Sequence, residues 1–233
     1  FPAYLPSRLA AFYERAGCVQ SLSGAAGSVS IIGAVSPQGS DFSEPVTQNT
    51  KRFVRCFLAL DKSLAYARHY PAINWTMSYS EYYEDLDPYY TEHLGEKFCT
   101  MRGRILGLLS EENKLMEIVK LIGSDVLPDD QKLTLEIARV IRLGFLQQNA
   151  FHQEDTSVPM EKQFLMMETI LYLYEKCRAL INRGMPVSVL KEDKIFERII
   201  AIKYEVPNKE PERFDEYHKD IDRFYDNVLE RNG

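Results

Sequence analysis

Three pairs of adjacent carboxylates are the residues whose types and spacing first suggest chemistry. They are Glu84-Asp85, Glu111-Glu112 and Asp129-Asp130. Two carboxylates in different environments can serve as general acid and general base in hydrolysis. Each pair, however, falls at a predicted helix start or on a polar helix face, where acidic side chains complement the helix dipole or are solvated. Capping or solvation is therefore favoured over acid-base catalysis, and we assign no catalytic residue.

The familiar catalytic and metal-binding signatures are missing from the sequence. It contains no G-x-x-x-x-G-K-[ST], H-E-x-x-H or G-x-S-x-G, and its 4 histidines have no metal-ligand spacing. The cysteines are scattered without C-x-x-C spacing, at Cys18, Cys56, Cys99 and Cys177. Free thiols in a reducing cytoplasm are thus favoured over disulfides or zinc. Spacing alone identifies neither an enzyme nor a metal site.

Two aromatic residues in predicted loops are candidates for ligand binding. Tyr70 precedes Pro71 in an irregular connector, and Phe151 lies just past a predicted helix end, after the amides Gln147, Gln148 and Asn149. Loop aromatics often line ligand sites. From the residues alone, core packing is still favoured over ligand stacking for both rings.

Composition places the chain among ordinary globular proteins. It is 45% hydrophobic and 27% charged, with a formal net charge of -6 and a pI near 5.4. This charge gives no basic footprint, so we expect no nucleic-acid partner. No apolar run approaches the roughly 18 to 20 residues that span a bilayer. Membrane association would therefore run only through partner subunits.

The domain organisation depends on the stretch Gly27 to Thr47. Its apolar, β-branched run Val29 to Val35 ends at Pro37 and predicts a fully buried strand of a parallel sheet. No other segment predicts a strand as strongly, so the partners of this strand are expected outside the sequence. The opening Phe1, which is not an initiator Met, supports the same expectation that the chain is a piece of a larger protein.

The remaining periodicity is helical. We predict a short helix from Pro6 to Ala16, joined to the strand by the flexible residues 21–28, and a helical pattern from Thr47 to the end of the chain. Further helices are predicted over 47–66, capped by Thr47, and over 78–85. A longer helix is predicted over 88–122, with a break near Gly103, Gly107 and Ser110 and a stop at Gly123; the turn 124–130 then leads into a second helix that forms a hairpin with it. The last predicted helices are 160–182, 193–204 and 211–231. The predicted fold is mainly α, a C-terminal helical bundle preceded by a helix-loop-strand remnant of an α/β domain.

Three long motifs carry a family resemblance. They are GSVSIIGAVSPQGSDFSEPVT, HYPAINWTMSYS and FLQQNAF. With them the chain resembles the C-terminal part of the catalytic A (alpha) subunit of V-type and A-type rotary ATPases. FPAYLPSRLAAFYERAG is similar to the family segment just downstream of the Walker B strand, and PVSVL with the helices after it resembles bacterial and archaeal members. F-type β subunits, non-catalytic B subunits and type III secretion ATPases share the plan, but SPQGSDFSEPVT and PAINW with SYS favour the A subunit.

The resemblance implies a division of labour. Residues 1–47 would be the C-terminal edge of a P-loop α/β nucleotide-binding domain, and 48–233 a helical C-terminal domain. The parent would couple ATP hydrolysis or synthesis to proton or sodium transport. In that family the P-loop, the catalytic glutamate and the Walker B aspartate precede this segment. ATP or ADP with Mg would thus be bound by the full subunit, while this chain alone is expected to be inactive and to hold no cofactor tightly.

The resemblance also assigns an adenine pocket. Tyr70 stands where the family usually has Phe in FPAINW, and Phe151 closes FLQQNAF. Gln148 and Ala150 would line the same pocket. A tyrosine keeps the stacking ring, and its hydroxyl then needs a hydrogen-bond partner or water.

The implied partners are B subunits in an alternating A3B3 ring, one of which supplies an arginine finger, and central stalk subunits. The acidic turn from Gly123 to Asp130 lies where the family contacts the stalk, although solvated surface is favoured from the residues alone. The implied location is cytoplasmic, peripheral to the membrane.

The rival interpretation is a stand-alone helical protein-interaction domain without nucleotide binding, which explains the helices but not the strand or the loop aromatics. A P-loop upstream in the reading frame would decide between them.

Overall fold

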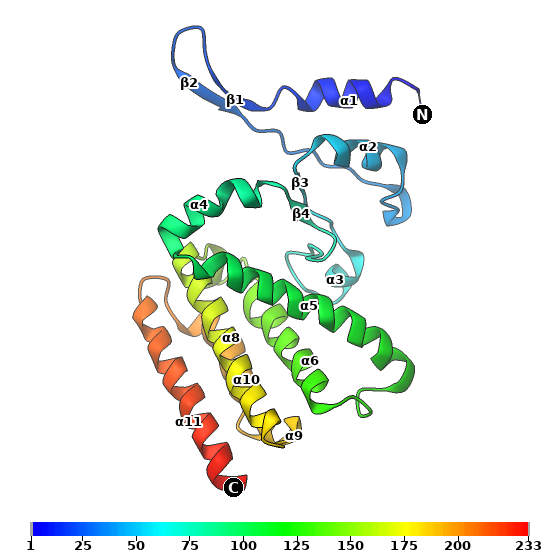
Figure 1. The fold of residues 1–233 in the computed structure, drawn as a ribbon. Coiled ribbons are helices and arrows are strands. Elements are labelled where there is room, and N and C mark those ends of the chain that lie inside the picture. Colours follow the sequence, from blue (N-terminus) through cyan, green and yellow to red (C-terminus); the bar gives the residue numbers. More distant parts are fainter. Residues whose placement is uncertain (1, 233) are drawn as a thin grey trace. The chain divides into compact units, whose positions relative to one another are not determined.

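The computed structural model describes residues 2–232 and is predominantly helical, as predicted (Figure 1). Phe1 and Gly233, which end the two predicted domains, lie outside the described residues. The chain divides into a first unit, Phe1–Ala59 with Met77–Asp85, and a second unit, Leu60–Thr76 with Leu86–Gly233. The predicted domain boundary between residues 47 and 48 concerns the larger protein and stays a prediction.

The first unit begins with a helix and a β-hairpin. Helix α1 spans Leu5–Tyr13, close to the predicted 6–16, and strands β1 (Gly17–Gln20) and β2 (Ala26–Val29) pair antiparallel. Gly24 turns the hairpin with a φ of 84°, a conformation that glycine adopts without steric cost. The predicted flexible connector 21–28 is thus the hairpin turn together with most of β2.

The predicted buried strand from Val29 to Val35 is wrong for this chain. Only Val29 is in a strand, and residues 30–37 form no regular element. The side chain of Val29 is 57% exposed and that of Ile32 is 98% exposed. A buried parallel strand needs neighbouring strands for its backbone groups, and the described residues provide no sheet beyond two hairpin-like pairs.

The predicted helix 47–66 is also wrong in its bounds and its cap. Helix α2 spans Pro45–Phe53 and is capped by Glu44, whose carboxylate accepts a hydrogen bond from the Thr47 amide at 3.1 Å. The apolar residues that follow form strand β3 (Cys56–Phe57), which pairs with β4 (Tyr79–Ser80). The predicted helix 78–85 is thus wrong in its first half, whereas residues 82–85 are helical and begin a longer helix. Tertiary pairing overrides the helical spacing here, because the Phe57 ring packs between Phe42 and Tyr79.

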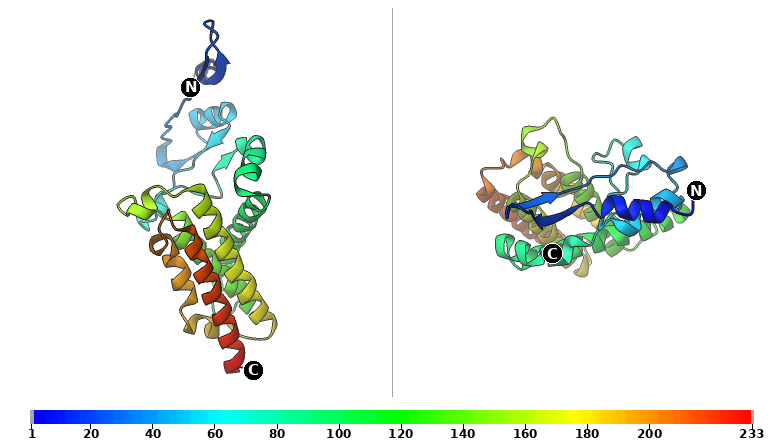
Figure 2. Two further views of the ribbon diagram at one scale, coloured as in Figure 1. Left: turned by 90° about the vertical axis from the view of Figure 1, so that its left-hand side faces the viewer. Right: turned by 90° about the horizontal axis from the view of Figure 1, so that it is seen from above.

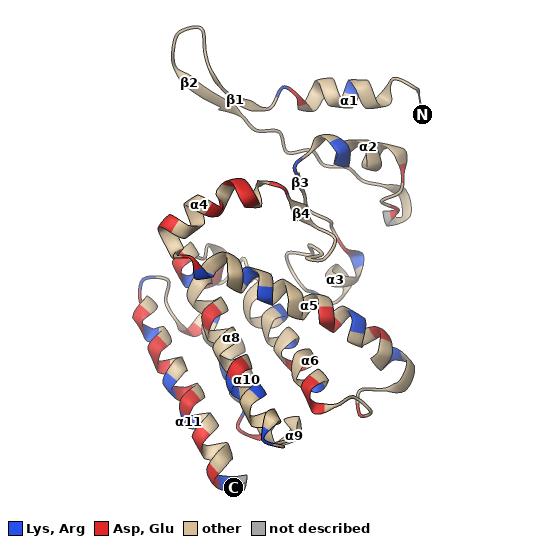
Figure 3. Cartoon of the chain, viewed as in Figure 1, with Lys and Arg blue, Asp and Glu red and all other residues tan. Residues whose placement is uncertain are grey.

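The second unit is a helical bundle whose long helices lie side by side (Figure 1 and the left view of Figure 2). Its elements are α3 (Lys62–Tyr66), α4 (Tyr82–Leu94, which starts in the first unit), α5 (Lys97–Ile122), α6 (Asp129–Ile141), the π-helical η2 (Arg142–Leu146), α7 (Gln153–Thr156), α8 (Met160–Asn182), α9 (Val187–Glu192), α10 (Ile195–Glu205), η3 (Pro211–Arg213) and α11 (Phe214–Asn232). The predicted helix 160–182 is confirmed at both ends. Acidic and basic residues are interspersed along α11 (Figure 3).

Glycines with positive φ set the main helix ends. Gly123 (φ 84°) stops α5 as predicted, and Gly184 (φ 88°) follows α8. The predicted break near Gly103 or Gly107 is wrong, because α5 continues through both residues. The break lies at Gly95 (φ 87°), between α4 and α5. Helical spacing alone tolerates an interior glycine, whereas a positive φ does not belong to an α-helix.

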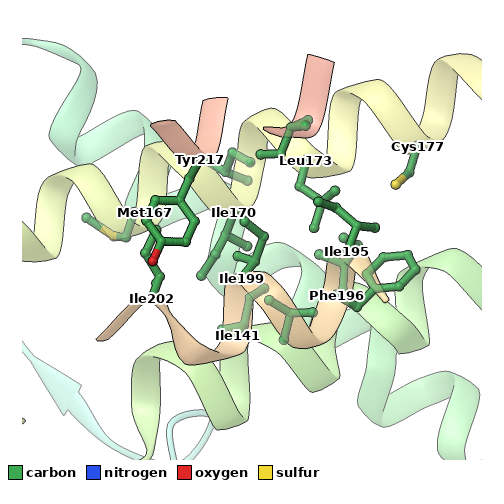
Figure 4. Close-up of a cluster of buried hydrophobic side chains, with 14 of the residues drawn as sticks. Ile141, Met167, Ile170, Leu173, Cys177, Ile195, Phe196, Ile199, Ile202 and Tyr217 are labelled. Atoms are coloured by element: carbon green, nitrogen blue, oxygen red, sulfur yellow. The ribbon is translucent and has the colours of Figure 1, made fainter. Parts of the chain in front are cut away.

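The core of the second unit lies where α6, α8, α10 and α11 meet (Figure 4). Ile141, Ile170, Phe196 and Ile199 have no exposed surface, and Tyr217 of α11 is 1% exposed. Burial of side chains of this size contributes about 1.5–3 kcal/mol each. This core packs α6 against α10, and the segment that follows η2 is hydrogen-bonded to α10.

A close backbone contact joins η2 to α10. A Cβ atom added at the buried Gly144 would lie 3.1 Å from the Cα atom of Ile200 and 3.5 Å from the carbonyl oxygen of Ile199. Unstrained carbon–carbon contacts lie at roughly 3.5–4.0 Å. Glycine therefore lets η2 pack directly on the backbone of α10.

We predict that Gly144→Ala lowers the free energy of unfolding by about 1–3 kcal/mol, because the added methyl group presses η2 away from α10. The matched control is Gly107→Ala in α5, where an added Cβ would meet nothing within 4 Å. That substitution should stabilise the chain by about 0.5–1 kcal/mol through helix propensity. Chemical denaturation followed by circular dichroism checks both values. Equal effects of the two substitutions would contradict the packing argument.

Candidate functional site

Two loops of the second unit are held against each other by hydrogen bonds to main-chain carbonyl groups. The Gln148 amide donates to the Tyr70 carbonyl oxygen at 2.7 Å, and the Gln147 side-chain amide donates to the Arg68 carbonyl oxygen at 3.2 Å. Segments nearly eighty residues apart in the sequence, around Tyr70 and around Gln148, thus form one local structure.

The Tyr70 loop is held by its own hydrogen bonds. The Asp61 carboxylate accepts from the Asn74 side-chain amide at 2.8 Å, and the Asp61 amide donates to the Ala72 carbonyl oxygen at 2.9 Å. His69 is buried beside the Trp75 ring, with 5.6 Å between ring centroids. Tyr70 remains 54% exposed, and its hydroxyl lies 3.4 Å from the Ala65 carbonyl oxygen, which provides the partner that the extra hydroxyl requires.

The second loop follows η2 and carries Phe151. The Asn149 amide donates to the Asp155 carboxylate at 2.7 Å, and the Asn149 side chain accepts from the Phe151 amide at 3.0 Å. The Ala150 carbonyl oxygen accepts from the Thr156 hydroxyl at 2.9 Å. The backbone is therefore well bonded, while the Phe151 side chain is 100% exposed.

The structure brings together the backbones of the predicted site residues and leaves their side chains outside the core. Tyr70, Gln148, Ala150 and Phe151 are all exposed. Core packing, which the residues alone favour for the two aromatic rings, is wrong. Exposed rings on hydrogen-bonded loops can stack on a planar ligand, with little loss of conformational freedom in the backbone.

Positive charge lies behind the loops. Burial lowers the pKa of His69, and the positive charges of Arg142 and Lys203 lower it further. Arg142 forms an ion pair with the buried Glu112 of α5, with 2.9 Å between Nη2 and Oε1. Burial raises the pKa of Glu112, and the Arg142 guanidinium opposes that rise. His69 is consequently neutral near pH 7 and acts as a packing residue beside Trp75.

Sequence reasoning missed the residues that support the second loop. Lys203 of α10 and Asp155 are 1% and 2% exposed, and Lys203 donates to the Gln147 carbonyl oxygen. The sequence did contain an indication that Lys203 is buried, because it lies in the apolar stripe of its helix with Ile199 and Ile202. A lysine in an apolar stripe indicates a buried cation that needs acceptors.

One carboxylate of each pair has a partner within the fold. Asp85 and Asp129 lie in the first turns of their helices, as predicted, whereas Glu112 is buried in the middle of α5 and is neither a cap nor solvated. Asp85 forms an ion pair with Arg55 at 2.7 Å, Glu112 pairs with Arg142, and Asp129 accepts a hydrogen bond from the Val187 amide at 3.1 Å. Among residues 2–232, no group of His, Cys, Asp or Glu side chains is arranged to hold a metal ion. In the same described range, no helix has the length and apolar character to cross a membrane.

Two family descriptions match the chain. Residues 1–80 match the ATP synthase alpha/beta family, nucleotide-binding domain, and residues 87–189 match the C-terminal domain of V and A type ATP synthase. The Tyr70 loop falls in the first match, and the Phe151 loop falls in the second. The candidate site thus combines residues from both matched regions.

Curated relatives are similar over nearly the whole chain. The V-type ATP synthase alpha chain 2 of Clostridium tetani is 53% identical and the V-type ATP synthase alpha chain of Halothermothrix orenii is 54% identical, each over 99% of this chain. The A-type ATP synthase A subunit of Methanopyrus kandleri is 47% identical over 99% of this chain. The chain spans 39% of the length of each of these relatives.

The fold is similar to that of a solved structure, the ATP synthase subunit NeqB from Nanoarcheaum equitans, with a TM-score of 0.62 and 22% sequence identity. The similarity covers 75% of this chain and 42% of that one. At this identity the likeness concerns the fold alone.

We predict that Phe151→Ala changes the free energy of unfolding by less than about 0.5 kcal/mol, because a fully exposed ring contributes little to folding. The control is Phe196→Ala, which removes a ring with 0% exposure and should cost about 3–5 kcal/mol. Denaturant titration of this chain measures both. A large loss for Phe151→Ala would mean that the ring packs in the fold and is not free for a ligand.

Proposed function

Since the chain belongs to the family of V-type and A-type ATP synthase A (alpha) subunits, we propose that it forms the C-terminal part of the catalytic subunit of a rotary ATPase. The parent subunit couples ATP hydrolysis or synthesis to transport of protons or sodium ions. The observation that carries the site assignment is the hydrogen bond from the Gln148 amide to the Tyr70 carbonyl oxygen. It joins the two segments to which the family resemblance assigns the adenine.

The proposed contribution of this chain is the adenine pocket. Tyr70 and Phe151 stack on the base, and Gln148 and Ala150 line the space between the loops. Stacking on an aromatic side chain contributes roughly 1–3 kcal/mol per contact, from which the cost of ordering the ligand is subtracted. The exposure of both rings and the bonding of both backbones support this role.

The phosphate end of the site belongs to the rest of the subunit. Phosphates and Mg in sites of this class are held by P-loop amides, a lysine and acidic residues, and this sequence has no G-x-x-x-x-G-K-[ST]. ATP or ADP with Mg therefore binds tightly only to the full subunit. This chain alone has no ATPase activity and at most weak, millimolar affinity for nucleotide.

The proposed partners are B subunits in an alternating A3B3 ring and the central stalk. The complex is peripheral to the membrane on the cytoplasmic side, and the transported ion crosses through other subunits. The rival interpretation, a helical interaction domain that binds no nucleotide, gains no support from the relatives.

The α5–α6 hairpin is the proposed stalk contact, and its tip is more apolar than the sequence suggested. Leu121 is 85% exposed and Val126 is 66% exposed. Asp129 is occupied within the fold, because its carboxylate accepts from the Val187 amide. The available acidic side chains are thus Asp125 and Asp130, next to apolar ones. A contact of this kind combines apolar packing with charge.

The hairpin is linked to the adenine loop through a continuous piece of structure. α6 runs directly into η2, and the Gln147 amide closes η2 by donating to the Arg142 carbonyl oxygen at 2.9 Å. The Glu112–Arg142 ion pair ties α5 to the same point. We therefore assign the hairpin the role of a lever that moves when the adenine pocket closes.

We predict that Tyr70→Ala and Phe151→Ala in the full subunit, assembled in its complex, each weaken ATP binding by roughly tenfold or more, since about 1.4 kcal/mol is a factor of ten. Tyr70→Phe keeps the ring and should be nearly neutral. Isothermal titration calorimetry on the complexes measures the affinities.

The matched control is Tyr89→Ala, which removes another half-exposed ring (47% against 54% for Tyr70) from α4. It should leave ATP affinity unchanged. Full ATP affinity in both the Tyr70→Ala and Phe151→Ala complexes would show that these loops do not form the adenine pocket. Micromolar affinity of this chain alone would contradict the assignment of the phosphate contacts to the rest of the subunit.

For the hairpin, we predict that reversing the two available charges, with Asp125→Lys and Asp130→Lys, weakens stalk assembly or the coupling of hydrolysis to transport. Nucleotide affinity should be unaffected, because the tip takes no part in base binding. Leu121→Ser with Val126→Ser should act in the same direction by removing apolar contact. Asp129 is left intact because of its bond to the Val187 amide.

The control for the hairpin variants reverses two exposed acidic residues of α11, with Asp226→Lys and Glu230→Lys. It introduces the same change in net charge away from the tip. Co-purification of the stalk and ATP-driven ion transport are the readouts. Normal assembly and coupling in both tip variants would refute the stalk contact.

A further inference from the structure

The loop that carries Phe151 is held from behind by a buried ion pair. The Lys203 ammonium of α10 donates to the Gln147 carbonyl oxygen and lies 3.7 Å from the Asp155 carboxylate. Asp155 in turn accepts from the Asn149 amide at 2.7 Å. Both charged side chains are almost completely buried, with side-chain exposures of 1% and 3%.

The Lys203–Asp155 pair binds the main chain of residues 147–149, at the start of the loop. The Gln147 carbonyl is bound by Lys203, the Gln148 amide is bound by the Tyr70 carbonyl, and the Asn149 amide is bound by Asp155. Three consecutive residues therefore have a main-chain group tied to a different part of the second unit. The orientation of this run decides where Gln148, Ala150 and Phe151 are presented.

Removing one member of the Lys203–Asp155 ion pair should be strongly destabilising. A buried ammonium must be paired and hydrogen-bonded, and removing one partner leaves the other charge buried without compensation. Burial lowers the pKa of Lys203, and the Asp155 carboxylate opposes that change. A methionine at position 203 has no N–H or O–H group to donate to the Gln147 carbonyl, so the loop loses its hydrogen bond to α10.

We propose that Lys203 and Asp155 are positioning residues for the base-binding loop, so that recognition of the adenine depends on them while recognition of the phosphates does not. The inference rests on the proposed function, because it assigns a support to the same adenine pocket. Neither side chain is exposed, so neither contacts the nucleotide directly.

The chain offers a closely matched control in a second buried lysine. Lys162 of α8 is 2% exposed, and its ammonium donates to the carbonyl oxygens of Lys203 and Val206 at 2.9 and 2.7 Å and to the Asn208 side chain at 2.9 Å. Burial lowers the pKa of this lysine as well. Its bonds go to the end of α10 and the segment beyond it, and to the Glu154 carbonyl oxygen, but not to residues 147–149.

The test uses the full subunit in its assembled complex and compares Lys203→Met with Lys162→Met. For Lys203→Met, the KM for ATP should rise roughly tenfold while kcat stays within about twofold, the pattern expected when ground-state and transition-state binding are lost equally. The inhibition constant of tripolyphosphate, which has phosphates but no base, should not change. Lys162→Met should lower the thermal midpoint by a similar amount and leave KM unchanged.

A second variant keeps the test decisive if the unpaired Asp155 prevents folding. Lys203→Met with Asp155→Asn removes both charges and retains an acceptor for the Asn149 amide, so the thermal midpoint should recover. The KM for ATP should stay raised, because the Gln147 carbonyl is still unanchored. A merely structural role of the pair would instead make KM recover together with stability.

The outcomes separate this inference from the proposed function. An unchanged KM in the double variant, or equal weakening of ATP and tripolyphosphate, would overturn the positioning role. If Phe151→Ala still weakens ATP binding in that case, the adenine pocket stands and only the support is misassigned. If Phe151→Ala has no effect either, the pocket itself is misplaced.

Discussion

The second unit depends on burying two ammonium groups beside an apolar core. An isolated ammonium in such a place costs several kcal/mol, so the acceptors around Lys162 and Lys203 must be fixed in space. Lys162 takes its acceptors from the end of α10, where the carbonyl oxygens of Lys203 and Val206 are bound. The last carbonyls of a helix have no intrahelical donors, and they are natural partners for a cation. Lys203 then reaches from the same helix to the loop at Gln147. The requirement to satisfy Lys203 thus orders the segment that follows η2, whereas the requirement to satisfy Lys162 orders the end of α10 and the segment beyond it.

This arrangement explains how an exposed site can be well defined. A loop with exposed aromatic rings gains little from burying its own side chains, so its order has to come from backbone contacts. Here the contacts come from behind, through Lys203 and Asp155, and from the side, through the Tyr70 carbonyl oxygen. Gly144 contributes by allowing η2 to lie directly on α10. The rings are left free for a ligand while the backbone beneath them is held.

The sequence predicted those parts of the fold that local rules determine. Helix 160–182 and the stop at Gly123 follow from apolar spacing and from glycines placed at the helix ends, Gly184 and Gly123. The run Val29 to Val35 was wrong as a strand because a strand is completed by its neighbours, and the described residues of the first unit pair only Val29 of that run, with Gly17. At the candidate site, the assignment of Tyr70 and Phe151 to base binding comes from the resemblance and stays a prediction. Lys203 was missed because helical periodicity assigns a lysine to the solvated face, and only its apolar neighbours signalled burial.

The same elements suggest why base binding and the lever belong to one piece of chain. A tilt of the α5–α6 hairpin could be taken up by a flexible joint at the end of α6, or it could be transmitted to the residues that follow α6. At the end of α6 the chain continues without a break into η2, which packs closely on Ile200 of α10 at Gly144 and is tied to α5 through Glu112 and Arg142. Packed interfaces of this kind resist gradual deformation. We infer that displacement of the hairpin is transmitted to Gln147 and the loop after it, so a change at the proposed adenine pocket and a change at the proposed stalk contact would be the two ends of one motion.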